Sequence, residues 1–166
     1  MRKRIAYFAM TVPLLLLFML LFLGSLAPVL TKTVAEAELS LPASKAWEKM
    51  MDFTSYPKWR RDIASVDKIY STGSNLAWKE TFKDQSEAQW ELIDAKPGDY
   101  IVLNRVLKNR SENERWTFTF RAVEEKTYMK VEVRESVVSP IKRAVILIRN
   151  QIHSPASEFL KSLASW

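Results

Sequence analysis

An uncharged stretch covers residues 5–30, and a basic cluster at residues 2–4 comes directly before it. The hydrocarbon core of a bilayer requires about 20 helical residues, and residues 8–27 alone supply that length. Because basic flanks stay on the cytoplasmic side, we predict a transmembrane helix over residues 5–30, with residues 1–4 as a cytoplasmic tail. The predicted location is the cell membrane, crossed once, with the C-terminal domain outside the cytoplasm.

A cleavable signal peptide is the alternative for this segment. Such peptides have an apolar core of about 7–15 residues, which residues 12–24 would supply, followed by small residues at the cut, here Ser25 and Ala27. The apolar run continues to Leu30, and Pro28 would follow the cut, so we favour the uncleaved helix.

The charge balance of the remaining residues argues against nucleic-acid binding. The formal net charge is +6, but three of the 25 basic residues belong to the N-terminal cluster, which leaves 22 basic residues against 19 acidic ones. This is not the one-sided basic field that nucleic acids require. The chain has no cysteine, so disulfides and thiolate metal sites are excluded. Residues 31–166 have the size of one domain.

Alternating apolar residues predict strands through most of this domain. Residues 33–41 place Ala35, Ala37 and Leu39 on one face and charged or polar residues on the other, which is typical of a half-buried strand that Pro42 ends. Six more strands are predicted, at residues 65–71, 76–83, 87–95, 100–107, 115–123 and 128–138. Their short connections imply antiparallel neighbours.

Helical patterns occur at two places in the predicted order. After the first strand, Ser44 is a plausible N-cap for one short helix, and Pro57 suits the first turn of a second. After the last strand, apolar residues recur at three- and four-residue steps from Ile141 to Leu163, which predicts one long C-terminal helix with a kink at Pro155.

This order of elements resembles the START-like superfamily, also called SRPBCC or the polyketide cyclase/dehydrase type, with its helix-grip fold. The residues Pro42, Trp47, Asp52 and Tyr56-Pro57-x-Trp59 are similar to the stretch after that family's first strand. The resemblance covers residues 33–166. It implies an α+β domain in which a seven-stranded antiparallel sheet surrounds a long C-terminal helix, here preceded by one transmembrane helix. It also implies an apolar cavity that holds a lipid, polyketide or other hydrophobic molecule.

The cavity-lining candidates are residues of the inward strand faces and of the helix stripe. They are Trp78, Glu80, Phe82, Trp90, Trp116, Phe118, Phe120, Met129, Val131, Glu135, Val145, Ile148 and Ile152. Two interpretations stay open, because these side chains could border a ligand or could fill the core at ordinary density.

The acids Glu80 and Glu135 interrupt inward-facing apolar patterns. A desolvated carboxylate there could act as a general acid or base, as in a cyclase- or dehydratase-like enzyme. The alternative is that each acid lies near the rim of the sheet or forms an ion pair with Arg105, Arg121 or Arg134. No catalytic motif is present, and no metal or other cofactor is expected. The single histidine, His153, is more consistent with a helix kink or a surface role than with catalysis.

The leading hypothesis is a membrane-anchored START-like domain that binds a hydrophobic or lipid-like small molecule. Its expected partners are the lipid bilayer and that ligand, and the sequence identifies no protein partner. The two alternatives are the cyclase-like enzyme and a ligand-free interaction module in a membrane complex.

Overall fold

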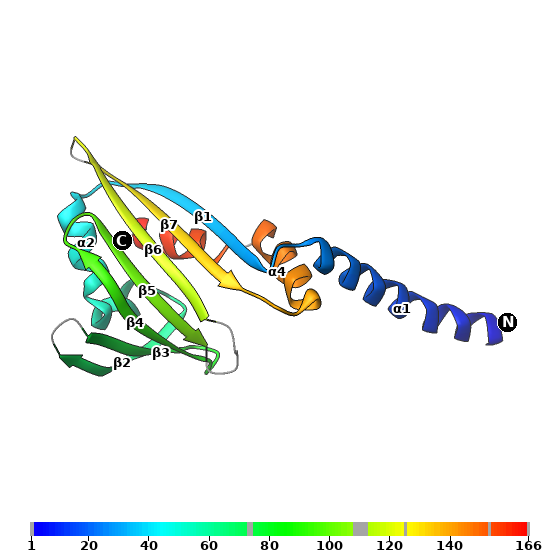
Figure 1. Ribbon diagram of the computed structural model, residues 1–166. Coiled ribbons are helices and arrows are strands. Elements are labelled where there is room, and N and C mark those ends of the chain that lie inside the picture. Colours follow the sequence, from blue (N-terminus) through cyan, green and yellow to red (C-terminus); the bar gives the residue numbers. More distant parts are fainter. Residues whose placement is uncertain (1, 73–74, 108–112, 125, 153, 166) are drawn as a thin grey trace.

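The computed structural model describes residues 2–72, 75–107, 113–124, 126–152 and 154–165, with the backbone alone for residues 2–10, 71–72, 75 and 150–152. His153 lies outside the described residues. A helix α1 leads away from one end of a curved sheet, and the remaining helices lie against that sheet or at its end (Figure 1).

The N-terminal helix α1 spans Arg2–Leu26 and is followed by strand β1, which begins at Leu30. Within the described part of the chain, no helix is both long enough and apolar enough to cross a membrane. The predicted single-pass membrane location is contradicted by this finding, and the described residues give no support to the predicted transmembrane helix or bilayer partner.

Among the described residues, seven strands form one antiparallel sheet in the order β1-β7-β6-β5-β4-β3-β2. Their bounds are Leu30–Leu39 for β1, Ile63–Thr72 for β2, Asn75–Phe82 for β3, Glu87–Lys96 for β4, Tyr100–Leu107 for β5, Asn113–Val123 for β6 and Lys126–Ser136 for β7. The predicted meander is confirmed, and β1 closes it by pairing with β7.

The inner face of the sheet is apolar because each strand buries alternate residues. Trp116, Phe118 and Phe120 of β6 lie opposite Val133, Val131 and Met129 of β7, and all six are buried. Register shifts interrupt the β2–β3 pair and the β4–β5 pair. Such bulges bend and twist a sheet, which lets its inner face curve around a helix.

Short helices follow β1 and cover one end of this face. They are α2 (Ala43–Met51), a 3-10 turn η1 (Phe53–Ser55) and α3 (Tyr56–Trp59). The helix α2 begins one residue before the predicted N-cap Ser44, and Pro42 occupies the cap position without a side-chain hydrogen bond. The buried side of α2 is formed by Ala46 and Met50.

The predicted long C-terminal helix is two helices, α4 (Pro140–Ile152) and α5 (Pro155–Ala164). Pro155 has no N–H for a helical hydrogen bond and would clash with the preceding turn, so a new helix begins there instead of a kink. Only α5 occupies the grip position, and it buries Ala156, Phe159, Leu160 and Leu163.

Helix α4 packs against the end of α1 rather than against the inner face of the sheet. A Cβ atom placed on Gly24 would overlap the carbonyl oxygen of Pro140, so only glycine permits this approach. Nε of the buried Arg143 donates to the carbonyl oxygen of Gly24 at 2.7 Å. The C-terminal turn of α1 therefore receives a hydrogen bond from α4.

Candidate functional site

A cavity of about 590 Å³ lies between α5 and the inner face of strands β3–β6, and we call it the grip cavity. Helix α3 and the β3–β4 turn border one side of it, and Arg149 of α4 borders the other. Its lining residues are Trp59, Arg60, Arg61, Asp62, Phe82, Asp84, Ser86, Trp90, Arg105, Leu107, Glu114, Trp116, Arg149, Pro155, Glu158, Phe159, Lys161, Ser162 and Ser165. The cavity therefore combines an aromatic floor with a charged rim.

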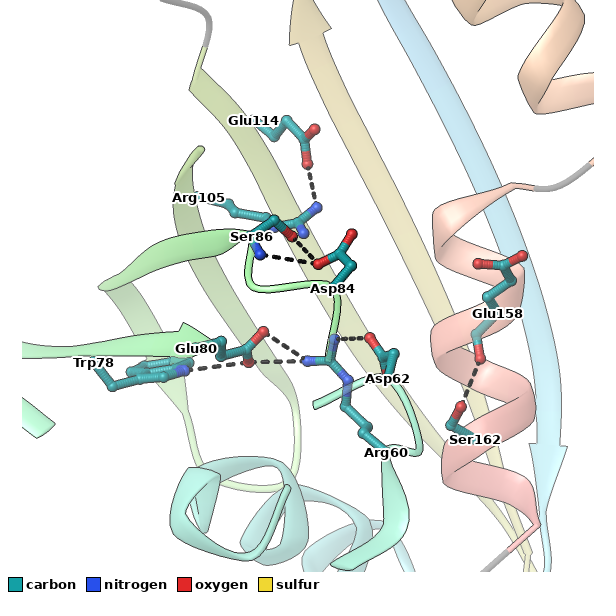
Figure 2. Close-up of polar contacts among 10 residues, drawn as sticks. All are labelled: Arg60, Asp62, Trp78, Glu80, Asp84, Ser86, Arg105, Glu114, Glu158 and Ser162. Carbon is teal, nitrogen blue, oxygen red and sulfur yellow. Dashed lines mark hydrogen bonds and ion pairs between the residues drawn. The ribbon is translucent and has the colours of Figure 1, made fainter. Parts of the chain in front are cut away.

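A buried ion pair connects Arg60, which lines the grip cavity, to Glu80 (Figure 2). Nη1 of Arg60 lies 2.9 and 3.0 Å from the two carboxylate oxygens of Glu80, while Nη2 lies 2.8 Å from Asp62. The indole N–H of Trp78 donates to Glu80 at 3.4 Å. Burial alone lowers the pKa of the Arg60 guanidinium, but the Glu80 and Asp62 carboxylates outweigh this and raise it. The guanidinium is therefore charged and held in place.

A second Arg–Glu–Trp group of the same composition lies on strands β5 and β6. Nη1 of Arg105 donates to Oε2 of Glu114 at 3.1 Å, and the indole N–H of Trp116 donates to the same oxygen at 2.9 Å. In both groups the tryptophan and the glutamate are two residues apart on one strand, so they share a face of the sheet. This spacing, Trp78-x-Glu80 and Glu114-x-Trp116, is the sequence signal that could have located the site.

Aromatic rings connect the two groups across the floor of the cavity. The Phe82 ring lies between the two guanidinium groups, 6.0 Å from that of Arg60 and 5.6 Å from that of Arg105. Trp90 stacks on Trp78 at 6.2 Å and meets Trp116 edge to face at 5.4 Å. Such contacts fix ring positions, because offset and edge-on pairs add to the energy of burial.

Phe159 of α5 closes the aromatic cluster from the helix side. Its ring lies 5.7 Å from that of Trp59, 6.1 Å from that of Trp116 and 5.3 Å from that of Phe118. Much of the space between sheet and helix is therefore filled by side chains. The open volume lies toward the side where α3 and the β3–β4 turn face α5.

The structure distributes the predicted lining residues over several environments. Phe82, Trp90 and Trp116 line the grip cavity. Trp78, Phe118, Phe120, Met129 and Val131 are buried in the core but do not border it. Val145 and Ile148 lie on the exposed side of α4, and the side chain of Ile152 lies outside the described residues. The α4 residues leave the grip because the helix is broken before Pro155.

The two predicted acids both have basic neighbours. Glu80 is completely buried and bound by Arg60, a partner that sequence reasoning did not consider. Glu135 lies directly opposite Glu114 across β6 and β7, and one of its oxygens lies 3.9 Å from Arg149. Glu135 borders a separate void of about 10 Å³, not the grip cavity. Neither carboxylate therefore faces the grip cavity.

A second cavity of about 890 Å³ lies at the opposite side of Trp59, between α2 and the C-terminal end of α5. Its lining residues are Leu39, Ser40, Leu41, Lys45, Glu48, Lys49, Asp52, Ser55, Lys58, Trp59, Leu163 and Ala164. Nζ of Lys49 lies 5.1 Å from the centre of the Trp59 ring, and burial lowers the pKa of this ammonium group to about 8. Trp59 thus forms a wall that both cavities share.

The architecture is similar to that of several solved structures. The Zhui aromatase/cyclase from Streptomyces sp. R1128 superposes with a TM-score of 0.67 at 9% identity, covering 82% of this chain and 92% of that one. A protein of Thermus thermophilus gives 0.65 at 12% identity, covering 81% and 95%. A START superfamily protein from Mycobacterium smegmatis gives 0.58 at 15% identity, covering 81% and 94%.

These similarities show that the chain has the START-like, or SRPBCC, helix-grip fold, as the order of its elements predicts. No protein-family model matches the chain, and no curated protein matches it. At these identities the likeness establishes the fold, and a fold alone hosts many functions. The function therefore depends on the residues of the cavity itself.

Proposed function

We propose that residues 31–166 bind a hydrophobic small molecule in the grip cavity. The observation that carries this proposal is a cavity of about 590 Å³ whose floor is formed by the rings of Phe82, Trp90, Trp116 and Phe159. Small-molecule sites are typically concave, about 300–1,000 Å³ in volume, and lined by aromatic residues with a few polar groups. The grip cavity has this volume and an aromatic floor, while charged residues and serines form most of the rest of its lining.

The aromatic floor suits a molecule with a flat or elongated apolar body. Burial of its apolar surface would contribute about 25 cal/mol per Å². Ring faces would add the directional preferences of aromatic contacts. The aromatase/cyclase and START proteins among the similar structures support a ligand role for this position in the fold.

Binding without catalysis is the simpler assignment for this cavity. A general acid or base must reach the reacting atoms within hydrogen-bond distance. Glu80 is buried, does not line the cavity and is held by Arg60, and Glu135 borders the separate small void. The cyclase-like alternative, which depends on these two acids, therefore gains no support.

A pair of substitutions on α5 tests the location of the ligand. Ser162 borders the grip cavity, while the exposed Ala164, two residues later, borders the second cavity. We expect Ser162→Trp to fill the grip cavity and to lower the affinity for 2-ethylnaphthalene, measured by titration calorimetry, at least about 10-fold. Ala164→Trp is the matched control and should leave that affinity within about twofold.

Near-ultraviolet circular dichroism would establish that both variants keep the native packing. The proposal is wrong if the unsubstituted full chain does not bind the probe. It is also wrong if Ala164→Trp weakens binding and Ser162→Trp does not, because the ligand would then occupy the second cavity.

A further inference from the structure

Two residues that line the grip cavity each carry a buried N–H group that has no acceptor among the residues that the structure describes. They are Nε1 of Trp90 and Nε of Arg105. We propose that the bound molecule carries a carbonyl or carboxylate oxygen that accepts hydrogen bonds from these two groups, an inference that rests on the proposed function. This inference deepens the proposed function by specifying the chemistry of the ligand.

The two donors belong to one cross-strand pair. Trp90 of β4 lies directly opposite Arg105 of β5, so both side chains leave the sheet on its inner face at the same position. The guanidinium carbon of Arg105 lies 5.2 Å from the centre of the Trp90 ring. Both residues line the grip cavity. A ligand oxygen at this part of the cavity lining would therefore have two unpaired donors on neighbouring side chains.

The neighbouring polar groups differ because the protein itself supplies their acceptors. The indole N–H of Trp78 donates to Glu80, and that of Trp116 donates to Glu114. Trp90 lies between these two tryptophans and is 2% exposed. No described side chain accepts a hydrogen bond from its indole N–H. A buried donor without an acceptor destabilises the folded chain, so most buried donors in native proteins have partners. The unpaired donors are explained if a ligand supplies the acceptor.

The donor types restrict the ligand group. Indole and guanidinium nitrogens donate and do not accept, so the matching group must present a lone pair. The charge of Arg105 is already opposed by Glu114 at 3.1 Å, so a neutral carbonyl suits the position as well as a carboxylate does. The predicted ligand class is a flat apolar molecule with an aryl ketone, aldehyde or carboxylic acid oxygen.

A matched pair of probes isolates this oxygen. 2-Acetylnaphthalene and 2-ethylnaphthalene have nearly the same shape, but only the first has a carbonyl oxygen. We expect the full chain to bind the acetyl probe about 10-fold more tightly than the ethyl probe in titration calorimetry. Trp90→Phe keeps an aromatic ring and removes the N–H, so it should reduce this ratio to about 2 or less.

Two further variants separate the donor role from a structural one. Trp78→Phe also removes an indole N–H, but one that donates to Glu80, and it should leave the probe ratio unchanged. Arg105→Lys keeps the charge and removes Nε, so it should reduce the ratio as Trp90→Phe does. If Trp90→Phe does not fold, Arg105→Lys and the shift of the Trp90 indole proton on binding, measured by NMR, provide the test.

The outcomes distinguish this inference from the proposed function. If both probes bind the unsubstituted chain equally, the ligand needs no acceptor and this inference is overturned, while the proposed function stands. If Trp78→Phe reduces the ratio as much as Trp90→Phe, the assignment of the donor is overturned. If neither probe binds, the proposed function fails and this inference fails with it.

Discussion

Arg60 and Glu80 form an ion pair inside the domain, in which one guanidinium nitrogen lies 2.9 and 3.0 Å from the two carboxylate oxygens. Glu80 is completely buried and Arg60 nearly so. The pair joins the end of α3 to β3, two elements that border the grip cavity. Its integrity should therefore determine how firmly α3 is held at the sheet.

The first prediction concerns the stability that this pair provides. Glu80→Gln leaves the Arg60 charge buried with Asp62 as its remaining carboxylate partner. Removal of one member of a buried ion pair typically costs about 3–5 kcal/mol, so we expect a loss of that size in the free energy of unfolding, measured with urea. Glu48→Gln, which breaks an exposed pair with Lys45, is the control and should cost at most about 1 kcal/mol.

The double variant Arg60→Met with Glu80→Met removes both charges, and it should recover most of the lost stability because no unpaired charge stays buried. If Glu80→Gln does not fold, the double variant still tests whether an unpaired buried charge is the cause. Equal small losses for Glu80→Gln and Glu48→Gln would show that the buried pair does not hold α3.

The second prediction concerns pH and Lys49. Burial lowers the pKa of this group to about 8, whereas an unfolded lysine titrates near 10.5. Between these pH values the unfolded chain binds more protons than the folded chain, so this group makes stability rise with pH there. Below pH 8 its buried charge is unfavourable. We expect Lys49→Met to increase the free energy of unfolding at pH 7, and the increase should shrink between pH 8 and 10.5.

Urea unfolding of both chains at pH 7 and pH 10 checks this difference. Lys45→Met replaces an exposed lysine of the same helix and serves as the control. A stabilisation by Lys49→Met that stayed constant or grew toward pH 10 would contradict the lowered pKa.

The third prediction concerns the contact of α1 with α4. A Cβ atom on Gly24 would overlap the Pro140 carbonyl, so Gly24→Ala should force the two helices apart. The chain has no cysteine, so spin labels can be placed at cysteines introduced at Leu17 and Leu147, both exposed. Double electron–electron resonance spectroscopy should report a longer distance between these two spin labels in the Gly24→Ala variant. The control Ser25→Ala should leave it unchanged, and an unchanged distance in both variants would refute the required close approach.

Local patterns predicted the sheet well because each strand buries one face. The alternation of Trp116, Phe118 and Phe120 predicted which face of β6 is the inner one, and all three side chains are buried in the structure. The short turns gave the antiparallel order of β2 to β7. These features depend on residues that are neighbours along the chain or on the next strand.

Features that depend on distant parts of the chain were harder to predict. The inward position of Glu80 was evident, but its partner Arg60 comes from α3, and no spacing rule connects the two. The stripe through Val145 and Ile148 has helical spacing, yet Pro155 separates it from the helix that occupies the grip. Periodicity identifies an apolar face but not the element that covers it.

The most direct test of the proposed binding site is an NMR measurement on the full chain with 2-acetylnaphthalene. Intermolecular nuclear Overhauser effects report which side chains lie beside the probe. The proposed function predicts effects from the probe protons to the rings of Trp90, Trp116 and Phe159. Effects confined to Leu39, Leu41 and Leu163 at the second cavity, or no intermolecular effects at all, would contradict it.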